Sequence, residues 1–100
     1  MENPIKNFKV RNCNSLVDPC GTVRNQFIIT VRTEKGYKEI FQSYDTVIAV
    51  IDEDHQVWLD RCSWEYSTTT AKYRNQFLGE NTAETRKKVK SGEYKLANLN

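Results

Sequence analysis

The spacing of apolar residues changes once along this chain, in the stretch from Ser63 to Leu78, and this change limits the folds that the chain can adopt. Before this stretch, apolar and polar residues alternate or form short β-branched runs, a pattern typical of strands. From it onward, apolar residues follow the 3.6-residue period of a helix. Strands followed by helices predict an α+β fold. Residues 1–100 contain no Pro/Gly/Ser-rich linker, so we expect a single domain.

Strand-like runs lie within about residues 7–60 and predict an antiparallel meander of four to five strands. They are residues 7–12, 23–33, 37–44, 46–51 and 56–60. Gly36 can supply the positive φ of a turn between the second and third runs. In the second run, Phe27, Ile29 and Val31 share one face, which we expect to be buried. Ile28 is the apolar exception on the opposite face.

Two short helices are predicted at about residues 68–78 and 82–91, packed on the sheet. A hydroxyl of Ser67 or Thr68 can cap the first helix, and Gly79 ends it. The run of hydroxyls from Ser67 to Thr70, near Lys72, also resembles an anion site at a helix N-terminus. Capping accounts for the same residues, and we favour it.

The second helix begins with the capping-box sequence Asn81-Thr82-Ala83-Glu84 and ends before Gly92. Its apolar face is thin, so we expect it to lean on the sheet or on the first helix. Residues 94–99 predict a last strand or a docked tail. Arg74 falls within the apolar arc of the first helix, where we expect its head group to reach solvent or an acid across the sheet.

The cysteines Cys13, Cys20 and Cys62 are odd in number and are not closely paired, which argues against a disulfide framework. A zinc site with His55 is the alternative to free thiols, and we favour free thiols. We therefore predict no metal and no cofactor. The longest apolar run, residues 47–51, is too short to span a membrane, and the N-terminal residues lack a signal-peptide core. These features predict a cytoplasmic protein.

Two charged stretches are the candidate binding sites. Residues 68–100 contain seven Lys/Arg and three Asp/Glu, so the C-terminal third is the basic part of the chain. The candidate binding residues are Asp52, Glu53 and Asp54 in a predicted turn, and Arg86, Lys87, Lys90 and Lys72 on the predicted helices. An acidic turn and a basic helix could steer the protein toward a charged partner. Solvated turn acids and cations that complement a helix dipole are the simpler interpretation.

Enzymatic chemistry has little support in the sequence. It contains no glycine-rich phosphate loop and no nucleophile elbow around a Ser or Cys. Spatially gathered carboxylates such as Asp52 and Asp54 keep a metal-dependent nuclease as a third hypothesis. We predict no catalytic residues.

Several motifs together resemble a family of small uncharacterised proteins of bacteriophages and prophage-bearing bacteria of the gut and Firmicutes type. They are N-Q-F-I-I at 25–29, F-Q-S-Y-D at 41–45, I-A-V-I-D at 48–52, W-E-Y-S-T-T-T-A-K-Y at 64–73, F-L-G at 77–79 and E-T-R-K-K-V-K-S-G-E-Y at 84–94. The resemblance covers about Val23 to the C-terminus. The segment from Cys13 to Cys20 departs from the family pattern, which mostly has a short turn there.

The resemblance implies an accessory protein of the host cytosol that contacts a host protein. We therefore expect a non-enzymatic, phage-type protein that binds a host macromolecule, most simply a protein, and inhibits a host defence or nucleic-acid-processing system. An edge strand would also allow β-augmentation or a homodimer. Nucleic-acid binding through the basic helix is the second hypothesis.

Overall fold

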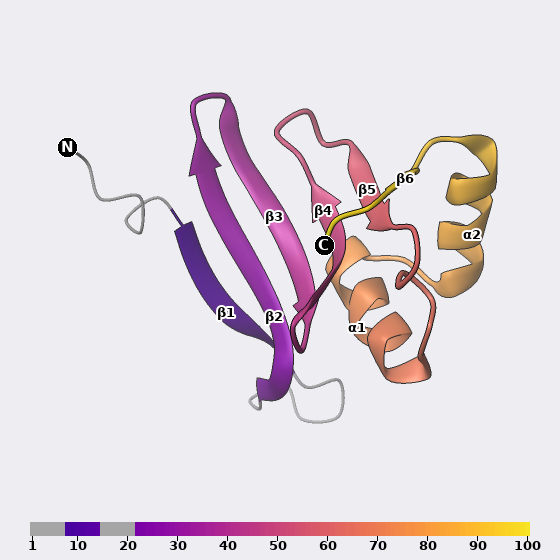
Figure 1. Cartoon of the computed structure of the whole chain (residues 1–100), viewed down its shortest axis with the longest axis horizontal. Helices are drawn as coiled ribbons and strands as arrows, with labels where there is room; N and C mark the ends of the chain where they lie inside the picture. The colour runs from indigo at the N-terminus through magenta and orange to yellow at the C-terminus, as the bar shows by residue number, and fades with distance from the viewer. Residues whose placement is uncertain (1–7, 15–21) are drawn as a thin grey trace.

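The structure is a computed structural model that describes residues 8–14 and 22–100. Its elements are β1 (Phe8–Asn14), β2 (Thr22–Thr33), β3 (Gly36–Ser43), β4 (Thr46–Ile51), β5 (Val57–Asp60), α1 (Thr68–Leu78), α2 (Thr82–Ser91) and β6 (Lys95–Ala97). The predicted α+β class is confirmed, with a meander followed by two C-terminal helices (Figure 1). A sixth strand then follows α2, as the pattern of residues 94–99 allowed.

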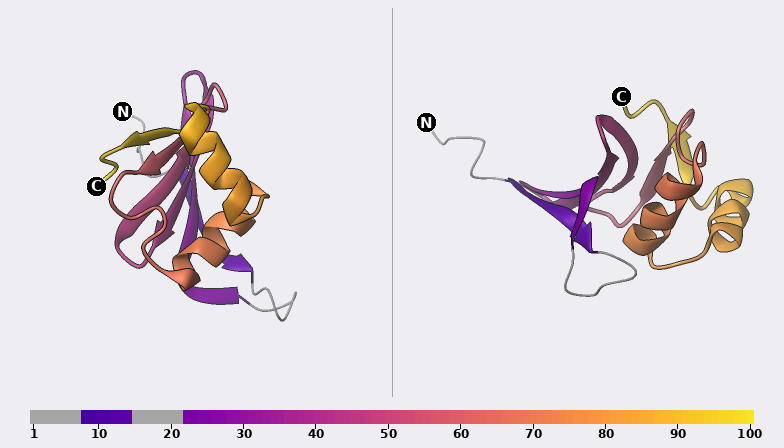
Figure 2. Two further views of the ribbon diagram at one scale, coloured as in Figure 1. Left: turned by 90° about the vertical axis from the view of Figure 1, so that its right-hand side faces the viewer. Right: turned by 90° about the horizontal axis from the view of Figure 1, so that it is seen from below.

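The six strands form one sheet in the order β1-β2-β3-β4-β5-β6. Neighbours from β1 to β5 are antiparallel, whereas β6 is parallel to β5. A parallel neighbour requires a long crossover, and α1 and α2 supply it. Both helices lie on one face of the sheet, as the two views of Figure 2 show. Within the described residues, no helix is long and apolar enough to cross a bilayer.

The helix ends follow the local signals in the sequence. Ser67 caps α1 by accepting a hydrogen bond from the Thr70 amide at 3.0 Å, and Gly79 ends the helix with φ 71°. Asn81 and Glu84 form a capping box at the start of α2, with hydrogen bonds of 2.8 and 3.3 Å. Each contact lies within a few residues of chain, which explains why the boundaries could be predicted.

The core lies between the sheet and the helices. Phe41, Ile48, Ala49 and Leu59 are completely buried there, and the Phe77 ring of α1 stacks on Phe41 with 5.9 Å between centroids. Among the residues whose burial the structure describes, Val57, Tyr94 and Ile28 complete the buried apolar set.

The predicted buried face of β2 is wrong. Ile28 and Gln26 are buried, while Phe27 and Ile29 are half-buried on the opposite face. The register explains this, because Ile28 lies opposite Phe41, which faces the helices. Both faces of β2 carry apolar residues, so alternation alone could not identify the face that the helices cover.

The C-terminal tail is attached to the sheet by side-chain contacts. The Leu99 amide donates to the carboxylate of Asp60 at 3.0 Å. The Asn100 side chain accepts from the Val47 amide at 2.7 Å and donates to the Val47 carbonyl at 2.9 Å. The side-chain amide thus pairs with β4 as a strand backbone would, at a point past the end of β5.

Candidate interaction surface

The acidic turn between β4 and β5 is organised by Asp52. Its carboxylate accepts hydrogen bonds from the amides of Asp54 and Gln56, both at 2.9 Å, and from the Trp58 indole at 3.0 Å. The indole bond, followed by the two amide bonds, holds the pKa of Asp52 below its ordinary value against the opposing effect of burial. Asp52 is therefore a charged residue that shapes the turn.

The two other acids of this turn differ in whether their carboxylates have partners within the protein. Glu53 accepts a hydrogen bond from the Thr33 hydroxyl at 2.6 Å, which lowers its pKa, and lies 4.0 Å from the Lys38 ammonium. These contacts tie the β4–β5 turn to the β2–β3 hairpin. Asp54 is exposed, and within the described residues its carboxylate makes no hydrogen bond or ion pair. Asp54 is thus the acid of this turn that stays available to a partner.

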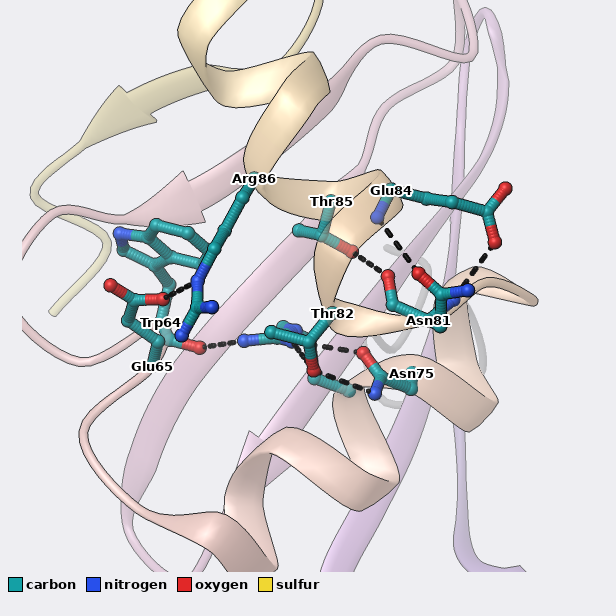
Figure 3. A network of polar contacts seen from close by, with 9 residues as sticks. Trp64, Glu65, Asn75, Asn81, Thr82, Glu84, Thr85 and Arg86 are labelled. Atoms are coloured by element: carbon teal, nitrogen blue, oxygen red, sulfur yellow. Dashed lines mark hydrogen bonds and ion pairs between the residues drawn. The ribbon is translucent and has the colours of Figure 1, made fainter.

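The basic residues of α2 also fall into two groups, those that form an ion pair and those that do not. Arg86 pairs with Glu65 at 3.0 Å (Figure 3), and Lys88 pairs with the nearly buried Glu80 at 2.8 Å. Lys87 and Lys90 are exposed and make no ion pair within the part of the chain that the structure describes. On α1, Lys72 is also exposed.

One hydrogen bond links the acidic turn to the segment after α2. The Gln56 side chain donates to the Glu93 carbonyl at 2.7 Å. The two charged stretches, which the sequence could only treat separately, are therefore neighbours at this point of the fold.

Arg74 is completely buried, so the prediction that its head group reaches solvent or an acid is wrong. Its guanidinium donates to the Trp64 carbonyl at 2.6 Å, Asn75 Oδ1 at 2.9 Å and Thr82 Oγ1 at 3.1 Å. Figure 3 shows this network around Trp64, Asn75 and Thr82. The cation also lies 5.3 Å from the centroid of the Trp64 ring. Arg74 joins the segment before α1 to the start of α2, a structural role that no local pattern signals.

A second buried polar group, centred on Glu80, was also missed by the sequence analysis. Its carboxylate accepts from Thr85 and Tyr94 hydroxyls at 2.5 Å and from the Lys88 ammonium at 2.8 Å. Burial would raise the pKa of Glu80, but these donors outweigh it and lower the pKa. The group joins the α1–α2 loop to both ends of α2, and we assign it a structural role.

Two hydroxyls of the Ser67–Thr70 run make contacts within the protein, one as the cap of α1 and one with β3. Ser67 is the cap, and the buried Thr70 hydroxyl lies 3.3 Å from that of Ser43 on β3. Thr68 and Thr69 are exposed. These positions agree with the capping interpretation.

Of the three cysteines, the structure describes the side chain of Cys62 alone. Cys62 is an exposed free thiol. Cys20 lies outside the described residues, and so does the side chain of Cys13 in β1. Among the described residues, no group of three or more His, Cys, Asp or Glu side chains is arranged to hold a metal ion.

The face of the sheet turned away from the helices carries a connected set of half-buried apolar side chains. Because residues paired across strands point to the same side, the register from Ile29 to Ile40, Val50 and Trp58 defines this face. We call it the open face and define it by six of its side chains, those of Phe27, Ile29, Val31, Ile40, Val50 and Trp58. Neither helix lies on this side of the sheet (Figure 2).

A hollow of about 540 Å³ lies at one end of the open face. Its apolar lining is Val50, Trp58 and Leu99, and its charged lining is Lys35 and Lys38 from the β2–β3 hairpin and Asp52, Glu53 and Asp54 from the β4–β5 turn. We call it the Trp58 hollow. It brings the predicted acidic residues next to an aromatic side chain that the sequence analysis had treated only as part of a strand.

A comparison with known families places the chain. The model of a family of unknown function, DUF8033, matches residues 16–93. The chain belongs to this family. The DUF8033 match includes β2 to β5 and both helices, and it begins earlier than Val23, where the sequence motifs suggested that the resemblance starts. No curated protein and no solved structure matches the chain.

Proposed function

We propose that this DUF8033 protein is a non-catalytic, phage-type accessory protein that acts in the host cytosol by binding a host protein. The observation that carries the proposal is the open face. Its six apolar side chains lie on the side of the sheet that the helices leave uncovered, and charged residues border them. A contiguous apolar patch with a charged margin is typical of a protein-binding surface.

The exposed charges of the acidic turn and of α2 contribute to this role. Asp54 borders the open face through the Trp58 hollow, and Lys87 and Lys90 remain free of ion pairs within the described residues. Charges around an apolar centre mainly set the rate and orientation of association, while the buried centre supplies most of the affinity. We therefore assign the main contact to the open face and the steering to the charged residues.

The test is affinity capture from a lysate of a Firmicutes-type host after nuclease treatment, followed by reconstitution with the purified protein that is captured. We expect Ile29→Lys and Ile40→Lys to abolish binding, because each places an ammonium group in the middle of the apolar contact. Thr69→Lys places the same group at an exposed position of α1, serves as the control on the helix side and should retain the partner. Circular dichroism and thermal unfolding of each variant separate loss of binding from loss of folding.

Retention of the partner by both folded open-face variants would overturn the proposal. Loss of the captured material after nuclease treatment would favour the second candidate, nucleic-acid binding through Lys87 and Lys90. In that case Lys87→Ala and Lys90→Ala should each lower the slope of log K against log salt by about one.

A further inference from the structure

The Trp58 hollow has a composition that points to the chemistry of its ligand. Val50, Trp58 and Leu99 give it an apolar lining that can cover the stem of a long side chain. Val50 and Trp58 also belong to the open face, so the hollow continues the surface assigned to the partner protein. A ligand that fills the hollow is thus one side chain of a larger contact.

Three acids and two lysines line the hollow, so its lining carries one net negative charge. Glu53 and Lys38 form an ion pair at 4.0 Å and offset each other. Asp52 receives hydrogen bonds from neutral donors alone, so its negative charge is stabilised but not neutralised. The Asp54 carboxylate makes no hydrogen bond or ion pair within the described residues, and Lys35 makes no ion pair there. Among the residues that line the hollow, two carboxylates and one ammonium group therefore lack an ion-pair partner in the described part of the chain, and the Lys95 ammonium lies near the Trp58 ring outside this lining.

The Trp58 ring already attracts a cation of its own chain. The Lys95 ammonium lies 6.0 Å from the ring centroid, and Lys95 is exposed, with no hydrogen bond or ion pair of its side chain among the described residues. An indole face is the best aromatic partner for a cation. A guanidinium group is planar and weakly hydrated, and can stack on the ring while donating to a carboxylate in two parallel hydrogen bonds.

We propose that the Trp58 hollow is the subsite in which the partner protein places one arginine side chain. The guanidinium stacks on Trp58, displaces Lys95 from the ring and pairs with Asp54, while the stem lies on Val50 and Leu99. This assignment rests on the proposed function, because it specifies what one end of the open face recognises.

The experiment is a titration of the intact ¹⁵N-labelled chain at low salt with N-acetyl-argininamide, followed by NMR. The uncharged citrulline analogue is the matched probe. The indole N–H signals of Trp58 and Trp64 report on the hollow and on the buried Arg74 network, respectively. We expect argininamide to shift the Trp58 signal, with a dissociation constant about three to ten times lower than that of the citrulline analogue. The Trp64 signal should stay in place.

The variant Asp54→Asn should weaken argininamide binding about threefold. Its control is Asp45→Asn, which makes the same change of charge in the exposed β3–β4 turn, outside the lining of the hollow, and should leave the dissociation constant unchanged. Equal binding of both probes, or equal effects of both variants, would overturn the arginine assignment.

The two proposals fail in different ways. If the open-face variants lose the partner protein but argininamide leaves the Trp58 signal unmoved, the proposed function stands and the arginine subsite is wrong. If argininamide binds at Trp58 but no partner depends on the open face, the hollow would belong to a small guanidinium compound, and both the proposed function and this assignment would be overturned.

Discussion

At the scale of single residues, Arg74 is the side chain whose environment differs most from its usual one. It is a completely buried cation whose two terminal nitrogens donate to neutral oxygens and whose guanidinium lies near an indole ring, while its Nε has no hydrogen-bond partner among the described residues. Arginine suits this position because its fixed fork of donors reaches three acceptors at once. A lysine has the same charge but cannot reproduce this geometry.

We expect Arg74→Lys to lower the free energy of unfolding by about 2–3 kcal/mol, because hydrogen bonds from a charged donor are lost inside the protein. Urea denaturation measures the effect. Arg86→Lys is the matched control, since Arg86 is exposed and its pair with Glu65 should contribute less than about 1 kcal/mol. Equal losses in the two variants would contradict the structural role of Arg74.

Tyr94 provides a pH-dependent test of the Glu80 group. Burial, followed by the hydrogen bond to Glu80, raises the pKa of Tyr94 to about 12. An unfolded tyrosine ionises near pH 10, as a rough reference value. The stabilisation is therefore complete below about pH 10 and is lost as the pH rises toward about 12.

We expect Tyr94→Phe to lower the free energy of unfolding by about 1.5–2 kcal/mol at neutral pH, because the Glu80 carboxylate loses one of its donors. The difference from the unchanged protein should shrink as the pH rises above about 10. Tyr73→Phe is the control, since the Tyr73 hydroxyl makes no hydrogen bond to the described residues. A difference that stays constant up to pH 12 would argue against this coupling.

At the scale of elements, the stability of α2 depends more on contacts at its two ends than on the packing of its apolar face. Among its ten residues only Thr85 is buried, and Val89 is its apolar contact with the core. Short helices with a thin apolar face are marginal on their own, so capping and the Glu80 group hold α2 in place. The cations Lys88 and Lys90 in its last turn also complement the helix dipole.

Asn81→Ala should lower the free energy of unfolding by about 1 kcal/mol, because the amide of Glu84 loses its acceptor and the capping box is broken. Chemical denaturation measures the loss, and hydrogen exchange should show faster exchange in the first turn of α2. Lys87→Ala, at an exposed position of the same helix, should change stability by less than about 0.5 kcal/mol. A similar loss from both changes would mean that the cap is unimportant.

At the scale of the whole molecule, the two faces of the sheet have different roles. The face carrying Ile28 packs against the helices, whereas the open face has half-buried side chains and neither helix on it. Adjacent residues of one strand therefore belong to two different surfaces. This arrangement gives a direct test of which face is the core.

Ile28→Ala should lower the free energy of unfolding by about 2–4 kcal/mol, because it leaves a cavity next to Phe41. The same change at the neighbouring residue, Ile29→Ala, should lower it by about 1 kcal/mol or less, because the half-exposed site can admit water. Thermal and urea unfolding of the pair measure the difference. A larger loss from Ile29→Ala would mean that the face of Phe27, Ile29 and Val31 is the buried one.

The sequence by itself determined the fold class, the bounds of both helices and the chemistry of their caps. The fold class follows from the order of strand-like and helix-like runs, and the helix ends depend on residues within about four positions of one another, as Asn81 and Glu84 or Asn75 and Gly79 illustrate. Of the seven charged candidates, Asp52, Glu53 and Arg86 serve the turn or an ion pair of the protein itself. Only the tertiary structure decided which face of β2 is buried, that Arg74 is inside, and that Lys35, Lys38 and Leu99 line one hollow with Trp58. These outcomes depend on strand register and on the side that the helices cover, and contacts between residues distant in sequence set both.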